Sequence, residues 1–529
     1  MTGEHMYDYV IVGGGSAGSV LAARLSEDPG VTVCLVEAGP ADHDPNIRVP
    51  IDSPKLFRTH QDWDLDSHPE AGAEGRRVYL PRGRVLGGSG ALNGMVYVRG
   101  ARSDYDGWGQ PGWSYEELLP YFLRSEDNER GASPFHGVGG PMAVSDARSR
   151  NPSALAFVDA AVEAGHRATD DFNGPDQEGF GLFQLTQRDG ERVNSSIAFL
   201  RPALSRPNLT VETNVHVTRV VIEHGRARAV RGRRLEEEVE FPAAREVVLA
   251  AGAFGSPQLL MLSGVGDADE LRALGLDVVL DQPEVGRNLQ DHPHVWLGFA
   301  HPHPISLISA RDPRNVEEYQ AHRTGPLTSN GPESGGFVRS RPGLAAPDLQ
   351  FQCLPVLLLD GGLTPPPGHG ISFGASVLRP LSRGRLALAS DQPTAKPRIV
   401  FDYFAEPADL DTAATGVRIG LEISRQSALK TYTQTPYAVP DSESDADVRA
   451  FVRRHVQSLH HPVGTCAMGA VVDAELRVRG VEGLRVADAS VIPLLVSGNT
   501  NAPTVAIAEK AADLILGRPA LPRASVAAA

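Results

Sequence analysis

The sequence is poor in cysteine, in aromatic side chains and in net positive charge. Its 529 residues include 3 cysteines, Cys34, Cys353 and Cys466, too few and too widely spaced for a disulfide framework or a thiolate metal site. A formal net charge of −15 argues against nucleic acid as a partner, because phosphate binding requires a basic surface. We therefore expect no metal site, no nucleic acid partner and a reducing, cytoplasmic location.

Long uninterrupted hydrophobic segments are also scarce. The first residues, MTGEHMYDY, lack the basic region of a signal peptide. Val247–Gly266 is free of charged residues, but its four glycines, one proline and two serines favour a strand, a turn and a helix in a protein core. We expect no membrane span. A chain of this length is instead expected to form two large domains.

A glycine-rich motif follows the first apolar segment, Tyr7–Val12. The glycines Gly13, Gly15 and Gly18 stand between this expected strand and an amphipathic helix, SVLAARLSE. Such glycines permit a tight turn and let the main chain approach a pyrophosphate at the helix N-terminus. A second strand, VTVCLV, ends at Glu37, which is placed to accept a hydrogen bond from a ribose hydroxyl. The pattern predicts binding of NAD or FAD, and Glu37 disfavours NADP.

Further motifs extend to the other end of the chain. They are RGRVLGGSGALNGM within Pro81–Gly100, GAFGSPQLLMLSGVG at Gly252–Gly266, and, near the C-terminus, HHPVGTCAMG, LRVADASVIP and SGNTNAPTVAIAEKAADLI. Together these segments resemble the glucose–methanol–choline (GMC) family of FAD-dependent oxidoreductases, and most of all its choline-dehydrogenase-like branch. The matches are in the family's order and cover nearly the whole chain.

The resemblance implies an α/β fold, α+β overall, with two domains. A Rossmann-type FAD-binding domain is expected to be discontinuous, formed by residues 1–150, 206–299 and 458–529. A substrate-binding domain built on an antiparallel sheet is expected from residues 151–205 and 300–457.

The loop that contains Gly87, Gly88 and Gly90 exposes its main chain and suits a flat ring, and Asn93 offers a donor and an acceptor. A plain glycine turn before the strand MVYV is the alternative. In relatives with a covalent flavin, a histidine of this segment carries the bond. Pro81–Gly100 has no histidine, so the resemblance implies non-covalent FAD.

The positions that the residues and the resemblance assign to FAD binding run through the whole chain. They are Gly13, Gly15, Ser16, Ala17, Gly18, Glu37, Ala38, Arg84, Val85, Gly87, Gly88, Asn93, Gly94, Val96, Val217, Ala251, Asp488, Ala489 and Thr504. For Val217 and Ala251, ordinary sheet packing is an equal alternative.

Two adjacent histidines, His460 and His461, stand directly before Pro462. A residue before proline favours an extended main chain, in which successive side chains point to opposite faces, so the two are not expected to serve one reaction centre. The resemblance selects His461 as the catalytic base and Asn501 as the residue that positions the hydroxyl, with Asn499 as a turn or supporting residue. Histidine suits the role because its unperturbed pKa is about 6.5.

The expected reaction is oxidation of an alcohol to an aldehyde or ketone, with hydride transfer to flavin N5. The alternative is a flavin-containing hydroxynitrile lyase on the same fold. Oxygen or another electron acceptor would complete the cycle. Choline itself is not implied, because no cluster of aromatic residues is legible for a quaternary ammonium. The identity of the alcohol and the oligomeric state, a homodimer included, stay open.

Overall fold

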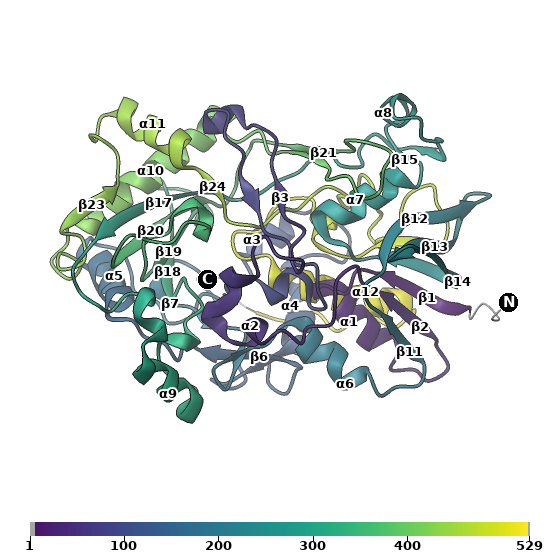
Figure 1. Ribbon diagram of the computed structural model, residues 1–529, viewed down its shortest axis with the longest axis horizontal. Coiled ribbons are helices and arrows are strands. Elements are labelled where there is room, and N and C mark those ends of the chain that lie inside the picture. The colour runs from purple at the N-terminus through teal and green to yellow at the C-terminus, as the bar shows by residue number, and fades with distance from the viewer. Residues whose placement is uncertain (1–5, 527–529) are drawn as a thin grey trace.

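The computed structural model describes residues 6–526, which form two large sheets (Figure 1). The first sheet has the order β11-β2-β1-β14-β13-β12, with β25 beside β14. Its centre is parallel, and the apolar segments YDYVIV and VCLV are buried there, as expected for strands covered on both faces. The strands are β1 Tyr7–Val12, β2 Val33–Val36, β11 Leu209–Glu212, β12 His216–Glu223, β13 Arg226–Arg234, β14 Glu237–Leu249 and β25 Leu484–Val486.

The second sheet is antiparallel, with the order β23-β17-β20-β19-β18-β7 and with β24 beside β17. The strand β17, Pro293–Ala300, belongs to this sheet. The segment 206–299 that we expected in the FAD-binding domain therefore extends into the second sheet at its C-terminal end. The strands are β7 Gly179–Leu182, β17 Pro293–Ala300, β18 Ser334–Val338, β19 Leu349–Leu354, β20 Gly370–Val377, β23 Thr435–Ala438 and β24 Gln457–Ser458.

Period-two alternation decides which side chains of the second sheet face the core. In β19, Leu349 and Phe351 pack toward the glycines Gly416 and Gly420 of helix α10. The intervening Gln350 and Gln352 therefore point to the opposite face. The expected antiparallel sheet is confirmed, and one of its faces is polar but uncharged at this strand.

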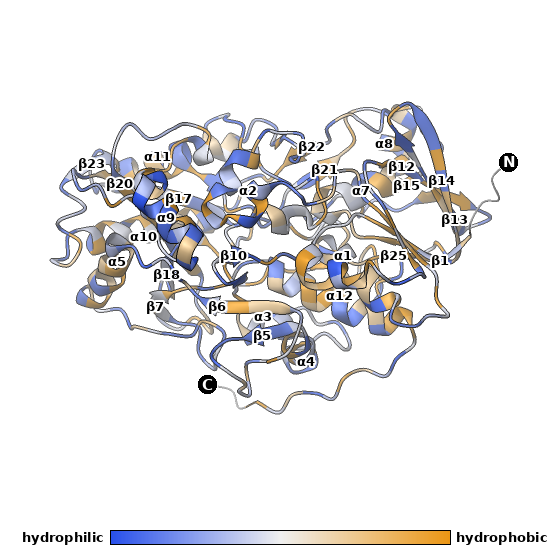
Figure 2. Cartoon of the chain, turned by 60° about the horizontal axis from the view of Figure 1, so that its bottom comes forward, coloured by the Kyte–Doolittle hydropathy of each residue, from blue (hydrophilic) through white to orange (hydrophobic). Residues whose placement is uncertain are grey.

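The helix α12 is buried along almost its whole length and packs beside α1 and α4. Its Glu509 lies in the interior and forms ion pairs with Arg24 and Arg124. Figure 2 shows predominantly hydrophobic strands around β1 and β25 and a hydrophilic α9. The α-helices are α1 Ser16–Leu25, α2 Pro45–Arg48, α3 Arg102–Asp106, α4 Tyr115–Ser125, α5 Pro152–Glu163, α6 Arg201–Ala203, α7 Gly252–Leu262, α8 Ala268–Ala273, α9 Pro313–His322, α10 Pro407–Ser424, α11 Asp445–His455 and α12 Asn501–Ile515.

Short strands complete the fold. They are β3 Leu65–Asp66 with β4 Tyr79–Leu80, β5 Glu126–Asn128 with β6 Met142–Asp146 and β8 Gln184–Leu185, β9 Gln187–Arg188 with β10 Glu191–Arg192, β15 Val265–Gly266 with β16 Leu280–Asp281, and β21 Arg385–Ala387 with β22 Arg398–Val400. Within residues 6–526, no helix is both long enough and apolar enough to cross a membrane. The segment Val247–Gly266 forms the end of β14, the helix α7 and the short strand β15.

Candidate active site

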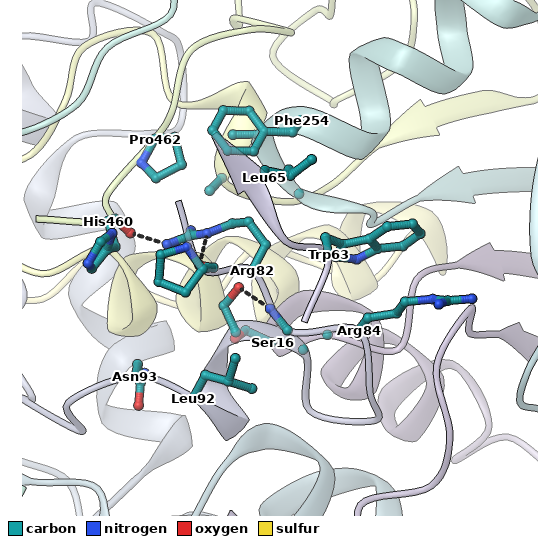
Figure 3. A pocket seen from close by; sticks show the side chains of 18 of the residues that line it. Ser16, Trp63, Leu65, Arg82, Arg84, Leu92, Asn93, Phe254, His460 and Pro462 are labelled. Carbon is teal, nitrogen blue, oxygen red and sulfur yellow. Dashed lines mark hydrogen bonds between the residues drawn. The ribbon is translucent and has the colours of Figure 1, made fainter. Parts of the chain in front are cut away.

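A cavity of about 670 Å³ is lined by residues of both sheets. The first sheet contributes the carboxyl ends of β1 and β2, at Val12 and Val36, and the second contributes Trp296, Gln352 and Leu354. Ligands of parallel α/β sheets bind at this end of the strands. Figure 3 shows part of the wall, with Arg82 reaching the main chain of His460 and with Trp63 beside Arg84.

The glycine-rich loops form a cradle without side chains at the start of α1. Gly15 directly precedes the helix, no side chain caps its first turn, and that turn carries no acidic residue. Gly88, with φ of +54°, approaches so closely that a Cβ placed there would lie 2.6 Å from the Cα of Gly15. Free main-chain amides and a positive helix end fit a pyrophosphate.

Glu37 and three neighbouring side chains form the end of the cavity nearest β2. The Glu37 carboxylate accepts hydrogen bonds from the main-chain nitrogens of Gly14 and Gly39, at 2.7 and 2.8 Å, and burial raises its pKa. Trp63 packs edge-on against His216, with ring centroids 5.6 Å apart, and the Arg84 guanidinium lies over the same indole. An acid and flat rings at one end fit a ribose and an adenine.

Most of the FAD-binding positions predicted from the sequence border this cavity. Those that line it are Gly13, Gly15, Ser16, Ala17, Glu37, Ala38, Arg84, Gly88, Asn93, Gly94, Val96, Val217, Ala251, Asp488, Ala489 and Thr504. Three others, Gly18, Val85 and Gly87, do not line it. Gly18 instead packs against the main-chain oxygen of Gly13, where a Cβ would lie at 1.8 Å, so its role is close packing of helix on strand.

His461 is held by hydrogen bonds on both ring nitrogens. Its Nδ1 lies 2.9 Å from Nδ1 of His292, and its Nε2 lies 3.2 Å from Nδ2 of Asn499. Its main-chain nitrogen donates to Asp291 at 2.8 Å. Burial, and then the neighbouring His292, hold the pKa of His461 well below its ordinary value, so the ring is neutral near pH 7.

The tautomer of His461 follows from its neighbour. Nε2 of His292 lies 3.1 Å from the carbonyl oxygen of Leu378, which can only accept, so this nitrogen carries the proton. Burial lowers the pKa of His292 to about 3, so its ring is neutral and its Nδ1 must accept. His461 therefore donates from Nδ1. The lone pair of its Nε2 is left facing Asn499 and the cavity.

The amide that accompanies His461 is Asn499, not Asn501. Nε2 of Gln350 donates to Oδ1 of Asn499 at 3.1 Å, which turns the Asn499 Nδ2 toward His461. Asn501 also lines the cavity, but its Oδ1 accepts from Oγ of Ser16 at 2.8 Å. Asn499 precedes α12 and Asn501 begins it, and the turn between them sends the two side chains to different partners.

His460 departs from the extended conformation expected before the His–Pro step. Its φ is +66°, in the left-handed region, so simple alternation does not separate the two imidazoles, and both border the cavity. His460 accepts a hydrogen bond from Arg82 on its main-chain oxygen, while its Nδ1 is buried without a hydrogen-bond partner. Burial lowers its pKa to about 3.

Several residues of the site carry no signal that separates them in sequence. Trp63 and His216 lie in segments without a nucleotide motif. His292 directly precedes β17 and Gln350 lies in β19. Only the fold brings His292 to His461 and Gln350 to Asn499. Asn499 stands within the C-terminal motif, two residues before the position that we predicted.

The fold and the cavity define a dinucleotide-binding protein. Residues of its second sheet line the same cavity as the pair His461 and Asn499. Residues 7–294 and 380–508 match the GMC oxidoreductase family. The chain is 43% identical to an alcohol dehydrogenase [acceptor] of Pseudomonas putida, covering 97% of this chain and 96% of that protein. It is also 43% identical to the mitochondrial choline dehydrogenase of Mus musculus, covering 98% of this chain and 91% of that protein.

Solved structures agree with this assignment. The crystal structure of pyridoxine 4-oxidase from Mesorbium loti superimposes with a TM-score of 0.87 and 33% identity, covering 97% of this chain and all of that one. A formate oxidase variant from Aspergillus oryzae superimposes with a TM-score of 0.90 and 28% identity, covering 97% of this chain and 99% of that one. The chain therefore belongs to the GMC oxidoreductase family, as its motifs predicted, and the family implies FAD as the cofactor.

Proposed function

We propose that this enzyme oxidises a primary or secondary alcohol to an aldehyde or ketone, with His461 as general base and Asn499 positioning the hydroxyl. The relatives named as alcohol and choline dehydrogenases support a substrate with a CH–OH group. The observation that carries the proposal is the unprotonated Nε2 of His461, which faces the cavity beside an amide donor.

The hydroxyl proton of the alcohol passes to Nε2 of His461. The imidazolium that results keeps its Nδ1 proton directed at His292, so the ring does not need to turn when it becomes charged. In the free enzyme Nδ2 of Asn499 donates to the Nε2 lone pair. When the alcohol binds, its hydroxyl takes the place of Asn499 at that lone pair, and Nδ2 donates to the substrate oxygen instead, in an orientation that Gln350 fixes. A positioned base of this kind contributes typically about 10²–10⁴ in rate.

The chemistry that FAD supplies when bound is acceptance of the alcohol's hydride at flavin N5. The main chain around Gly15 and Gly88 would hold the pyrophosphate, and Glu37 would hold the ribose. Leu92 lines the cavity within a segment that has no histidine, which supports non-covalent binding. Oxygen or another electron acceptor would then reoxidise the flavin.

Anaerobic mixing of the purified holoenzyme with a panel of alcohols tests the proposal. We expect the oxidised flavin absorbance to bleach with at least one alcohol, and admission of oxygen or an artificial acceptor then to restore it. A flavin that stays oxidised while a cyanohydrin is cleaved would identify the hydroxynitrile lyase instead.

A further inference from the structure

The wall that the second sheet presents to the cavity contains no charged side chain among the described residues. In β19, Gln352 and Leu354 line the cavity, and in β17 Trp296 does so. The neighbouring His294 on the same face of β17 donates to or accepts from Oγ of Ser376, and burial lowers its pKa to about 3, so it is neutral near pH 7. This face is therefore uncharged at physiological pH.

The loops beside this wall also contribute uncharged side chains to the cavity. Phe57 comes from the segment after the 3-10 helix Pro50–Leu56, Leu358 from the loop after β19, and Pro332 from the loop before β18. Gln457 of β24 adds a neutral amide. Apolar side chains and neutral amides thus form this part of the cavity wall.

The charged residues that do line the cavity belong to its other parts or already have partners. Glu37 accepts from two main-chain amides, and Asp488 accepts from Ser256 and from the main chain of Gly252. Lys396 pairs with Asp64 at 2.9 Å. Arg84 lies over the Trp63 indole, at the end of the cavity nearest β2.

Arg82 is a cavity-lining cation that contacts the main chain directly before His461. It donates to the main-chain oxygen of His460, and its charge helps to lower the pKa of His461. The carboxylate of Asp291, which attracts Arg82, lies outside the cavity wall and accepts from Tyr403 and the main chain of His461. A second cation would therefore meet a positive neighbour and no free carboxylate, at a large cost in desolvation.

We infer that the substrate, given the alcohol oxidation proposed above, is an uncharged alcohol with an apolar chain or ring, and that quaternary-ammonium alcohols are rejected. Trp296, Leu354, Leu358 and Phe57 supply the apolar surface against which the carbon skeleton packs. The side-chain amides of Gln352 and Gln457 can hydrogen-bond a neutral polar group of the substrate, but they carry no charge to pair with a cation. The enzyme differs in this from the relative that is named a choline dehydrogenase.

Choline and 3,3-dimethylbutan-1-ol form a matched pair for the test, because they share one shape and differ in charge. Anaerobic flavin reduction is followed with both, and with straight-chain alcohols, benzyl alcohol and their trimethylammonium counterparts. We expect the neutral member of each pair to reduce the flavin with a second-order rate constant at least about 100-fold higher. A cationic alcohol that equals or exceeds its neutral partner would overturn the inference while leaving alcohol oxidation intact. Bleaching by no alcohol of either class would instead overturn the proposed function.

A charge placed on the wall gives a second test that does not depend on the choice of alcohols. Gln352→Glu keeps the size of the side chain and adds a carboxylate, so we expect the preference for the neutral alcohol to fall by about tenfold or more. Gln320→Glu on α9, exposed and outside the cavity, is the control and should leave the ratio unchanged. An unchanged ratio in a flavin-loaded Gln352→Glu enzyme would show that this wall does not select by charge.

Discussion

Nδ1 of His292 faces Nδ1 of His461 at 2.9 Å, and this contact fixes which nitrogen of His461 holds a lone pair. His292 is anchored by the carbonyl of Leu378, so the proton order of both rings is set by a main-chain oxygen. Catalytic histidines are often oriented by a carboxylate. Here a neutral imidazole orients His461, so in the proposed mechanism the pair stays uncharged until a substrate proton arrives.

His292→Leu should lower the rate of alcohol-driven flavin reduction by about tenfold to 100-fold, because His461 loses the acceptor for its Nδ1 proton. His292→Asn should retain most of the rate, since its Oδ1 can accept and its Nδ2 can donate to Leu378. Single-turnover reduction of flavin-loaded variants gives the comparison. Equal losses in both variants would mean that His292 acts by packing alone.

His461→Ala should lower the same rate by about 10²–10⁴ through loss of the base. In the unaltered enzyme the rate should stay level as the pH falls through about 6.5, because the pKa of His461 is lowered and the neutral base persists. A pH profile of flavin reduction checks both points. A rate that falls by half near pH 6.5 would argue for a base with an ordinary pKa.

Asn499→Ala and Asn501→Ala separate the two amides of the C-terminal motif. Asn499→Ala should lower flavin reduction by about tenfold to 100-fold, because the substrate oxygen loses its donor beside His461. Asn501→Ala removes a partner of Ser16 and should act mainly on FAD content. The ratio of flavin to protein absorbance and the reduction rate are measured together. The reverse order of effects would restore Asn501 to the catalytic role.

Gly88→Ala should yield enzyme with little FAD. A methyl group at this position would lie 2.6 Å from the Cα of Gly15, and the φ of +54° is itself unfavourable for alanine. The loops would have to separate at the expected pyrophosphate site. Gly139→Ala, at a glycine with positive φ and no atom within 4 Å of its Cβ position, is the control for backbone strain alone. Flavin absorbance of both purified variants decides the outcome.

Stability should fall as the pH drops from about 6.5 toward 3. The buried imidazoles of His292, His294 and His460 each have a pKa lowered to about 3 by burial, whereas in the unfolded chain they take up protons near 6.5. Between these values the unfolded state binds more protons, so the free energy of unfolding decreases as the pH falls. Urea unfolding at a series of pH values measures the slope.

His294→Gln removes one of these groups and should make the decline with pH shallower, whatever its effect on stability at neutral pH. His224→Gln, at an exposed position, should leave the slope unchanged. A slope that is the same in both variants would show that His294 takes up a proton in the folded protein as readily as in the unfolded one.

The sequence alone determined the part of the fold that is expected to bind the dinucleotide. The strand–glycine–helix pattern at Tyr7–Leu25 and the apolar strands of the parallel sheet are local, because a tight turn and a buried strand each demand residue types at short spacing. The family resemblance also predicted the antiparallel sheet. The strand–glycine–helix pattern and the buried strands can be recognised in the sequence because each is encoded within a few consecutive residues.

The tertiary structure alone decided which side chains meet around His461, the proposed base. His292 is 169 residues from His461 in sequence and Gln350 is 149 residues from Asn499, so no spacing rule joins them. Whether Asn499 or Asn501 faces the imidazole depends on the direction of the turn before α12, and the left-handed φ of His460 depends on contacts with Arg82 and Ser458. Such choices are made by packing across the cavity, which a one-dimensional pattern does not contain.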